Sequence, residues 1–355
     1  MKILYVIPDP DRIGGVSTSV KRITQYLINK GFDLTICGLD FEPKNDNPIS
    51  EMIVLKDLLR GTLMQENTQK VIEKINHTSP DLIVGYYGTT AAYCATAAAK
   101  LVNLPIVVCL RGNDVNRDFF STFHAHKLAF VGHNASAITT VSTEMSLKLK
   151  AWLGIESKFI SNSVDKSLFF NDKSAAINFK QSHNLNKKPI IGLFGEFKHS
   201  RGIKLLNNLK QELKAFHVMI VGHIRKDYEN KLDHDFIIIP YIKEKEALRA
   251  AYSSCDIILQ PSKYDGMPNV VLEAMACERI VIASSVGGIK DIIRNGQNGY
   301  LCDTIESWKQ SIRDVLQNIN PELGINARNS VMDVKQEAKA FITLFKAVCD
   351  RHINK

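Results

Sequence analysis

The chain has 355 residues, of which 45% are hydrophobic and 23% are charged, and its formal net charge is +8. This length allows two domains, and this composition excludes a disordered chain, a collagen-like repeat and a disulfide-stapled scaffold. No apolar run approaches the ~18 residues of a membrane-spanning helix. The apolar start of the chain is broken at residues 8–11, so we expect neither a membrane span nor a signal peptide.

Seven cysteines lie mostly within apolar runs, and none belongs to a CxxC pair. This pattern predicts reduced, buried thiols in a cytoplasmic protein. Residues 1–165 carry a net charge of +1 and residues 166–355 carry +7. A basic half can attract phosphates or the anionic inner face of a membrane, and it can equally serve solubility alone. The basic residues are scattered and not interleaved with aromatics, which argues against nucleic acid as a partner.

The first half of the chain alternates strand-like and helical segments. Its strand-like runs are continuous apolar stretches at residues 2–7, 33–39, 81–87, 105–112, 137–142 and 158–164. Apolar residues recur at helical spacing between them, at residues 16–31, 66–77 and 90–101. Continuous apolar strands are typical of a parallel sheet that is buried on both faces.

The alternation restarts after a polar stretch at residues 165–188, which we interpret as a linker or insertion. Strand-like runs follow at residues 189–195, 217–222, 235–240, 255–262, 279–284 and 300–303, with helical patterns at 202–215, 244–253, near 268 and at 326–353. The two series predict an α/β fold in which two Rossmann-like, doubly wound parallel-sheet domains face each other across a cleft. We expect domains at residues 1–165 and 166–330, followed by a C-terminal helix at 331–355.

Ligands of doubly wound sheets bind beyond the carboxyl ends of the strands, so the loops after the strands are the places to search. Gly14 and Gly15 follow the first strand, where they allow a ligand to approach the backbone, although a tight turn explains them equally well. Asp9 and Asp11 have the form of a metal-binding pair. They are flanked by prolines in a loop, which indicates a solvated turn, and we predict no metal site.

A second loop combines glycines with cations directly after a strand. It contains Gly195, Lys198 and Arg201. Two cations before a helix suit a diphosphate, because they neutralise it and the arginine can fork onto two oxygens. Solvated helix-capping residues are the alternative.

A third loop, at residues 262–276, is the most specific of the four. Asp265 follows an apolar strand, Gly266 and Pro268 shape the turn, and Glu273 lies one turn inside the next helix. Two carboxylates in this arrangement can accept hydrogen bonds from the hydroxyl groups of one ligand, while a buried acid with a structural partner is the alternative for Glu273. A fourth loop brings Gly287 and Gly288 to another helix start, where structural turns explain most of the pattern.

These loops resemble those of the family 4 glycosyltransferases of GT-B fold. The resemblance rests on Gly15 with its following helix, on the glycine loop at residues 195–202, and above all on residues 265–301. Lesser matches lie at residues 140–149 and 160–169. It covers nearly the whole chain.

The resemblance implies a retaining, metal-independent transfer of a sugar from a nucleotide sugar, such as a UDP- or GDP-sugar, with no further cofactor. The N-terminal domain would bind the acceptor, the C-terminal domain would bind the donor, and the final helix would cross back to the N-terminal domain. The implied acceptor is a glycan or a lipid-linked glycan, and the implied process is the synthesis of a bacterial surface polysaccharide.

The family's paired acids fall on Asp265, implied to bond the transferred sugar, and on Glu273, implied to hold the ribose hydroxyls. Arg201 and Lys198 are implied to neutralise the diphosphate. Arg111 stands where the family usually has a histidine beside the reacting sugar. The remaining donor contacts are implied for residues of the glycine-containing loops, namely Gly15, Gly195, Gly266, Met267, Asn269 and Val270.

Three further positions depart from the family pattern. The first acid of the pair is the shorter Asp265, Glu196 replaces an arginine, and Glu278 replaces a common glycine. Two other functions therefore stay open beside the transferase: a non-catalytic, sugar-binding subunit of a polysaccharide-assembly complex, and a nucleotide-sugar epimerase.

Acceptor specificity is expected to come from the N-terminal loops at residues 40–66 and 111–127. The loop at residues 111–127 contains five aromatic or imidazole side chains, namely Phe119, Phe120, Phe123, His124 and His126. They can contact a sugar ring or a lipid carrier, and packing in the core is the alternative explanation for them.

Overall fold

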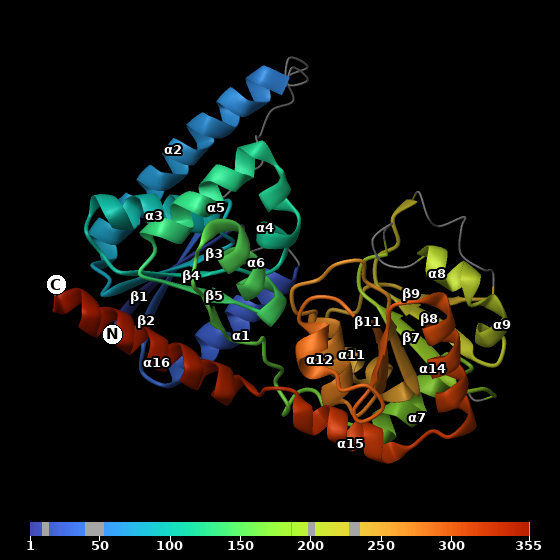
Figure 1. The fold of residues 1–355 in the computed structure, drawn as a ribbon. Coiled ribbons are helices and arrows are strands. Elements are labelled where there is room, and N and C mark those ends of the chain that lie inside the picture. Colours follow the sequence, from blue (N-terminus) through green and yellow to red (C-terminus); the bar gives the residue numbers. More distant parts are fainter. Residues whose placement is uncertain (9–13, 40–52, 186, 198–202, 227–234, 355) are drawn as a thin grey trace. The chain divides into compact units, whose positions relative to one another are not determined.

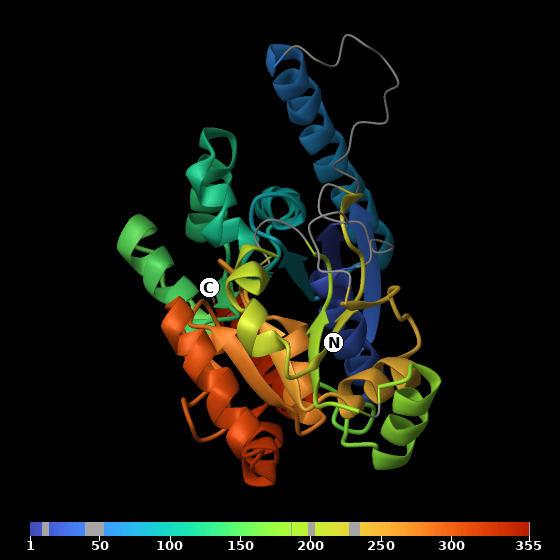
Figure 2. The ribbon, with the colours of Figure 1, turned by 90° about the vertical axis from the view of Figure 1, so that its right-hand side faces the viewer.

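The computed structural model of the chain describes residues 1–8, 14–39, 53–185, 187–197, 203–226 and 235–354. They form two compact units, Met1–Ser161 with Val334–Lys355, and Asn162–Asp333. Each unit contains one six-stranded parallel sheet with helices on its faces (Figures 1 and 2). This confirms the predicted α/β class with two doubly wound parallel sheets.

The first unit has the strand order β2-β1-β3-β4-β5-β6. Its strands are β1 (Lys2–Pro8), β2 (Asp33–Leu39), β3 (Leu82–Tyr86), β4 (Ile106–Cys109), β5 (Ala137–Thr140) and β6 (Lys158–Phe159). Its helices are α1 (Gly15–Asn29), α2 (Ile53–Thr78), α3 (Ala91–Leu101), α4 (Asn113–Asn116), the short 3-10 helix η2 (Asp118–Phe120), α5 (Thr122–Asn134), α6 (Thr143–Leu153) and α16 (Val334–Ile353).

Alternate residues of these buried strands face opposite layers of helices. Tyr5 and Val84 pack with α1 and α16, whose apolar faces include Ile23 and Phe341. Figure 1 shows α2, α3 and α5 on the other face of this sheet. The helix α3 contains six alanines, and these small side chains let it lie close against β3.

The second unit has the strand order β12-β11-β10-β7-β8-β9. Its strands are β7 (Ile190–Phe194), β8 (His217–Val221), β9 (Ile237–Ile239), β10 (Ile257–Gln260), β11 (Ile280–Ser284) and β12 (Tyr300–Cys302). Its helices are α7 (Lys173–Ser182), α8 (Ile203–Asn208), α9 (Lys210–Leu213), α11 (Lys245–Ser254), α12 (Asn269–Ala276), α13 (Ile289–Ile292), α14 (Ile305–Gln317) and α15 (Pro321–Ser330).

The polar stretch at residues 165–188 is part of this unit and not a linker. It contains α7, which begins after the side chain of Asp172 accepts a hydrogen bond from the Ala175 amide at 3.0 Å. The same carboxylate forms an ion pair with Arg249 of α11 at 3.1 Å, and α7 packs against α11. The polar composition of the stretch hid a helix that has only one buried residue, Ala176.

The C-terminal tail also differs from its predicted form. The pattern at residues 326–353 predicted one helix, whereas the structure has two, α15 and α16, separated at residues 331–333. Val164 and Asp333 pair there as an isolated parallel bridge. Because this pairing needs extended backbone, the helical pattern cannot continue through it.

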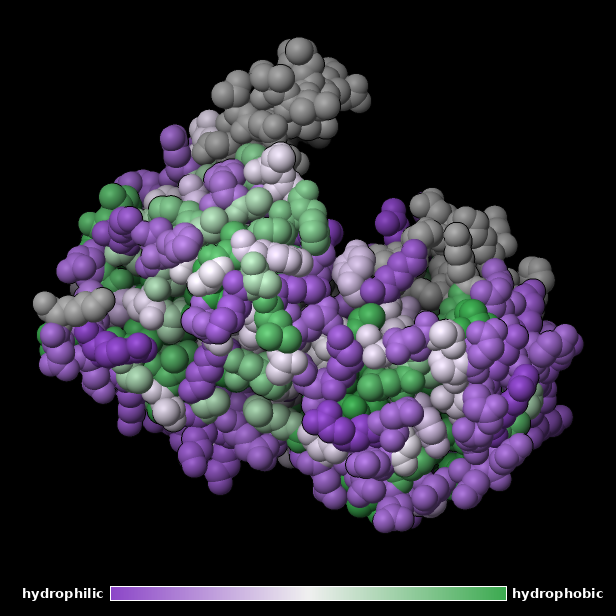
Figure 3. All heavy atoms as spheres, viewed as in Figure 1, coloured by the Kyte–Doolittle hydropathy of each residue, from purple (hydrophilic) through white to green (hydrophobic). Residues whose placement is uncertain are grey.

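The surface of the described residues is largely polar on the face seen in Figure 3. Among the residues described, no helix is long and apolar enough to cross a membrane.

We expect Gly85→Ala in β3 to destabilise the first unit. A Cβ atom at position 85 would lie 2.9 Å from the Cα of Ala92, so α3 would have to move away from the sheet. Overpacking of this kind costs about 1–3 kcal/mol and should lower the melting temperature by several degrees in a thermal denaturation followed by circular dichroism. Gly14→Ala is the matched control, because no atom lies within 4 Å of its Cβ position. An unchanged melting temperature for Gly85→Ala would contradict the close packing of α3.

Candidate functional site

Each sheet has one place where the strand order reverses direction, and loops from two neighbouring strands meet there. In the second unit this place lies between β7 and β10. Gly195 follows β7, and the loop with Asp265 follows β10. In the first unit it lies between β1 and β3, which are followed by Gly14 and by Tyr87. The fold therefore brings the second and third predicted loops to one ligand-binding edge.

The loop at residues 262–268 is held by the glycine pair of the fourth predicted loop. Gly287 has a φ of +51°, and a Cβ atom at this position would collide with the carbonyl oxygen of Asp265. The Gly288 amide donates a hydrogen bond of 2.6 Å to the carbonyl of Gly266. Position 287 thus requires glycine because of close backbone packing, and Gly288 supports the third loop through its amide hydrogen bond.

The carboxylate of Asp265 is partly fixed within its own loop. It accepts a hydrogen bond from the Gly266 amide at 2.9 Å and one from the Ser262 hydroxyl at 3.4 Å. The side chain is half-buried, so a hydroxyl group of a ligand can still reach it. Carboxylates held in this way need little reorganisation when a ligand binds.

Asn162 is a supporting residue that the sequence analysis missed. Its buried side-chain amide donates a hydrogen bond of 3.0 Å to the carbonyl of Met267. This ties the segment at residues 160–169 to the third loop across 105 residues of sequence. The resemblance of that segment to a family motif marked it in the sequence, but it did not indicate that Asn162 would bind the Met267 carbonyl.

Glu273 lies on α12, one turn after Asn269 and Val270, and its side chain is half-buried. The hydroxyl of Tyr252, on α11, donates a hydrogen bond of 3.0 Å to Oε2 of Glu273. Burial, and then the neighbouring Glu273 carboxylate, raise the pKa of Tyr252 well above its usual value, so the phenol stays neutral and donating. Tyr252 is itself fixed by stacking on Phe194 at 4.1 Å between ring centroids.

The glycine after β7 is also positioned by close backbone packing. Gly195 has a φ of +107° and its amide donates to the carbonyl of Val221 at 2.9 Å. Gly222, directly after β8, packs against Gly195 so tightly that a Cβ atom at position 222 would collide with the Gly195 carbonyl. Lys198 and Arg201, predicted for the same loop, lie outside the described residues.

In the first unit, a buried carboxylate organises the loop that carries Arg111. Asp114 accepts hydrogen bonds from the backbone amides of Gly88, Arg111, Gly112 and Val115 at 2.8–3.2 Å. Burial raises the pKa of Asp114, and these amide hydrogen bonds act in the opposite direction. Asp114 was not among the residues predicted from the sequence, although aspartate side chains in loops commonly accept hydrogen bonds from neighbouring backbone amides.

The Arg111 side chain connects this loop to α1 and, through Ser19 and Arg22, to α16. It lies over the ring of Tyr86, 5.1 Å from the centroid, and donates to the hydroxyl of Ser19. Arg22 donates to the same hydroxyl at 3.3 Å and forms an ion pair of 3.4 Å with Glu337. Glu337 is only 1% exposed. Arg111 is therefore held by groups from two other elements, and Gly15 begins the helix that supplies Ser19 and Arg22.

A second carboxylate holds the same loop to the end of β3. Asp118 accepts hydrogen bonds from the hydroxyls of Tyr87 at 2.9 Å and Thr89 at 3.2 Å. Tyr87 has a φ of +70°, which is a strained conformation for a large side chain. Strain of this kind persists only where the surroundings fix it, and here it lies at the ligand-binding edge of the sheet.

The described residues contain no group of three or more His, Cys, Asp or Glu side chains that could hold a metal ion. Asp9 and Asp11 are outside this set.

We expect Asp114→Asn to loosen the Arg111 loop. An asparagine offers one acceptor oxygen and turns an NH₂ group toward backbone amides that also donate, so at least one buried donor loses its partner at a cost of about 1–3 kcal/mol. Asp81→Asn is the control, since its carboxylate accepts a hydrogen bond at an exposed position, from the Lys2 amide. In thermal denaturation, the melting temperature should fall clearly for Asp114→Asn and hardly at all for Asp81→Asn. Equal melting temperatures would mean that Asp114 does not hold the loop.

Comparison with known proteins gives two family matches along the chain. The model described as "Glycosyltransferase Family 4" matches residues 13–168, and the model described as "Glycosyl transferases group 1" matches residues 188–318. Together they cover most of the chain.

Two related proteins and one solved structure align with most of the chain. A GDP-mannose-dependent alpha-mannosyltransferase of Corynebacterium glutamicum is 23% identical over 310 residues, which are 83% of this chain and 74% of that protein. The capsular polysaccharide biosynthesis glycosyltransferase CapM of Staphylococcus aureus is 24% identical over 340 residues, 86% of this chain and 87% of that protein. Anabaena HepE in complex with UDP-glucose has a TM-score of 0.76 and 17% identity, over 98% of this chain and 100% of its own.

Proposed function

The chain belongs to the family 4 glycosyltransferases of GT-B fold, and we propose that it transfers a sugar from a UDP- or GDP-sugar to a glycan or lipid-linked glycan during the synthesis of a bacterial surface polysaccharide. The family is a retaining one, and its members use nucleotide-sugar donors. Known proteins support both donor bases. The mannosyltransferase of Corynebacterium glutamicum depends on GDP-mannose, and HepE, which has a similar fold, is in complex with UDP-glucose. CapM, named for capsular polysaccharide synthesis, supports the proposed process.

The observation that carries this proposal is the support around the paired acids of the second unit. Asp265 and Glu273 lie on one loop and the helix that follows it, and three separate elements hold them through Gly287–Gly288, Asn162 and Tyr252. We assign the ribose hydroxyls to Glu273 and the hydroxyls of the transferred sugar to Asp265. The donor then contacts the start of α12, where the half-exposed or buried residues Gly266, Met267, Asn269 and Val270 provide backbone and side-chain groups.

We assign the diphosphate to the loop that follows β7. Gly195 lets the phosphates approach the backbone, and Lys198 and Arg201 neutralise the charge that grows on the leaving group. Cations in these places supply that stabilisation without a divalent metal ion. For the first unit we assign donor binding to Gly15 and a role at the reacting sugar to Arg111, as the resemblance to the family implies.

The proposed chemistry is a front-face transfer. The bond between the anomeric carbon and the diphosphate oxygen breaks while the acceptor hydroxyl attacks from the same side, and the hydroxyl proton passes to the departing phosphate oxygen. The leaving group acts as the base, so the route needs no enzymic nucleophile. The protein contributes positions and fixed charges that favour the transition state over the bound substrate.

We expect Glu273→Gln to weaken donor binding and turnover. Loss of a charged hydrogen-bond acceptor costs about 1.5–3 kcal/mol, which corresponds to a fall in kcat/KM of roughly 10- to 100-fold. Tyr252→Phe should show a smaller fall, because it removes only the group that orients the carboxylate. Glu278→Gln is the matched control, since Glu278 lies in the same unit with Asn171 as its partner at 3.0 Å.

The assay uses UDP-glucose and GDP-mannose as donors, with and without an added glycan acceptor. An isomerised donor formed without acceptor would indicate an epimerase. If Glu273→Gln and Glu278→Gln have the same donor affinity, the role assigned to Glu273 is wrong.

A separate prediction concerns the diphosphate. Arg201→Ala should lower turnover by about 10²- to 10³-fold, as expected for the loss of one partner of the transition-state charge. Lys187→Ala changes an exposed cation before β7 and should leave turnover unchanged. Near-normal turnover of Arg201→Ala would refute its assignment.

A further inference from the structure

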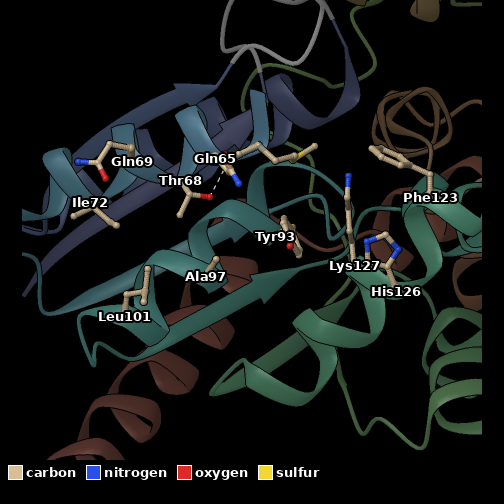
Figure 4. Close-up of a pocket in the computed structure, with 11 residues that line it drawn as sticks. Gln65, Thr68, Gln69, Ile72, Tyr93, Ala97, Leu101, Phe123, His126 and Lys127 are labelled. Carbon is tan, nitrogen blue, oxygen red and sulfur yellow. Dashed lines mark hydrogen bonds between the residues drawn. The ribbon is translucent and has the colours of Figure 1, made fainter. Parts of the chain in front are cut away.

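The first unit contains a pocket of about 480 Å³ between α2, α3 and α5, within the ~300–1,000 Å³ range of ligand sites. Its lining contains neither of the paired acids and no residue of the Arg111 loop. Its lining residues come from three helices and are Met64, Gln65, Thr68, Gln69, Ile72, Tyr93, Ala97, Leu101, Phe123, His126 and Lys127. Figure 4 shows them as an elongated groove.

One end of this groove carries positive charge among aromatic rings. Lys127 is 3% exposed, and its Nζ atom lies 3.6 Å from the centroid of Phe123 and 5.7 Å from that of Tyr93. His126 lies beside it (Figure 4). None of the residues that line the groove is acidic. An ammonium group shielded from water attracts an anion strongly, so this end favours an anionic group.

The other end of the groove carries apolar side chains and one uncharged amide, that of Gln69 (Figure 4). Ile72 and Leu101 lie there, and Ala97 separates Leu101 from the charged end (Figure 4). Leu101 is 73% exposed. Tyr93, Ala97 and Leu101 are spaced four residues apart, which places them in one row along about 12 Å of α3. Such a row can cover a hydrocarbon chain.

The charged end lies next to the reacting edge of the sheet. Tyr93 is in the first turn of α3 and Phe123 is in the first turn of α5, and these helices follow the carboxyl ends of β3 and β4. The Arg111 loop also follows β4. The apolar end lies at the opposite end of α3, near Leu101, so the groove leads away from that edge.

We propose that this groove binds the lipid phosphate of the acceptor, with the phosphate at Lys127 and His126 and the hydrocarbon chain along Ala97, Leu101 and Ile72. The assignment rests on the proposed function, which it deepens by naming the acceptor as a sugar carried on a lipid phosphate. A free glycan would leave the side chains of Ile72, Ala97 and Leu101 without an apolar partner, whereas a lipid phosphate matches both ends. The phosphate meets the ammonium when the ring of Phe123 turns aside.

The test is an isothermal titration of the whole protein with decyl phosphate below its micelle concentration. Decyl phosphate should bind at least about tenfold more tightly than inorganic phosphate and than decyl maltoside, which has the same chain and a neutral headgroup. Octyl phosphate should bind about tenfold more weakly than decyl phosphate, since two buried methylene groups are lost. Equal binding of decyl maltoside would exclude a role for the cation, and equal binding of inorganic phosphate would exclude a role for the chain.

Two variants locate the site. Ala97→Trp fills the groove at a partly exposed position, and Lys127→Met removes the cation, so each should weaken decyl phosphate binding at least about tenfold. Lys30→Met is the matched control, because Lys30 also lies over an aromatic ring, that of Tyr26 at 5.7 Å, but directly after α1 and away from the groove lining. Should Lys127→Met fail to fold, Ala97→Trp alone decides. Unchanged binding in Ala97→Trp would overturn the assignment.

The same preparations are tested for stabilisation by UDP, GDP and nucleotide sugars, which separates this inference from the proposed function. A protein that binds a nucleotide sugar but not decyl phosphate overturns the groove assignment alone. A protein that binds decyl phosphate but no nucleotide or nucleotide sugar overturns the donor assignment and leaves the lipid-phosphate site standing.

Discussion

The constraint on which the rest of this structure depends is that a parallel sheet must be covered on both faces. Each connection between neighbouring parallel strands then has to cross over the sheet, usually as a helix, and every strand ends at the same edge. In both units the loops that carry the candidate site residues lie at this edge. Gly195 and Asp265 meet there because β7 and β10 are neighbours where the strand order reverses, although 70 residues of sequence separate the two loops.

Loops at such an edge are useful only if they are held still, and here buried hydrogen bonds and close backbone contacts do this. Asp114 gathers four amides around the Arg111 loop. Gly287 packs so closely against the backbone of the Asp265 loop that any side chain at position 287 would collide with it, and Gly288 donates a hydrogen bond to the same loop. The site residues are therefore positioned before a ligand arrives, which reduces the cost of binding.

The sequence predicted the fold class and the family, because continuous apolar strands, glycine loops and the segment at residues 265–301 leave local signals. It did not predict the supporting residues. Tyr252, Asn162 and Asp114 act through partners that are distant in sequence or through backbone groups, and a single chain gives no pattern for such pairs. The helix α7 was missed for a related reason, since Ala176 is its one buried residue and the Asp172–Arg249 ion pair helps to fix it. The roles of Lys198 and Arg201 remain predictions.

The position of Arg111 depends on the last helix of the chain. A buried carboxylate is stable only with a positive or hydrogen-bonding partner, and Glu337 of α16 has Arg22. Arg22 and Arg111 share the hydroxyl of Ser19, so two cations lie close together near one buried acid. Without Glu337, no negative charge from α16 would offset the repulsion between Arg22 and Arg111. The C-terminal helix therefore completes the charge balance around a loop more than 200 residues earlier in the chain.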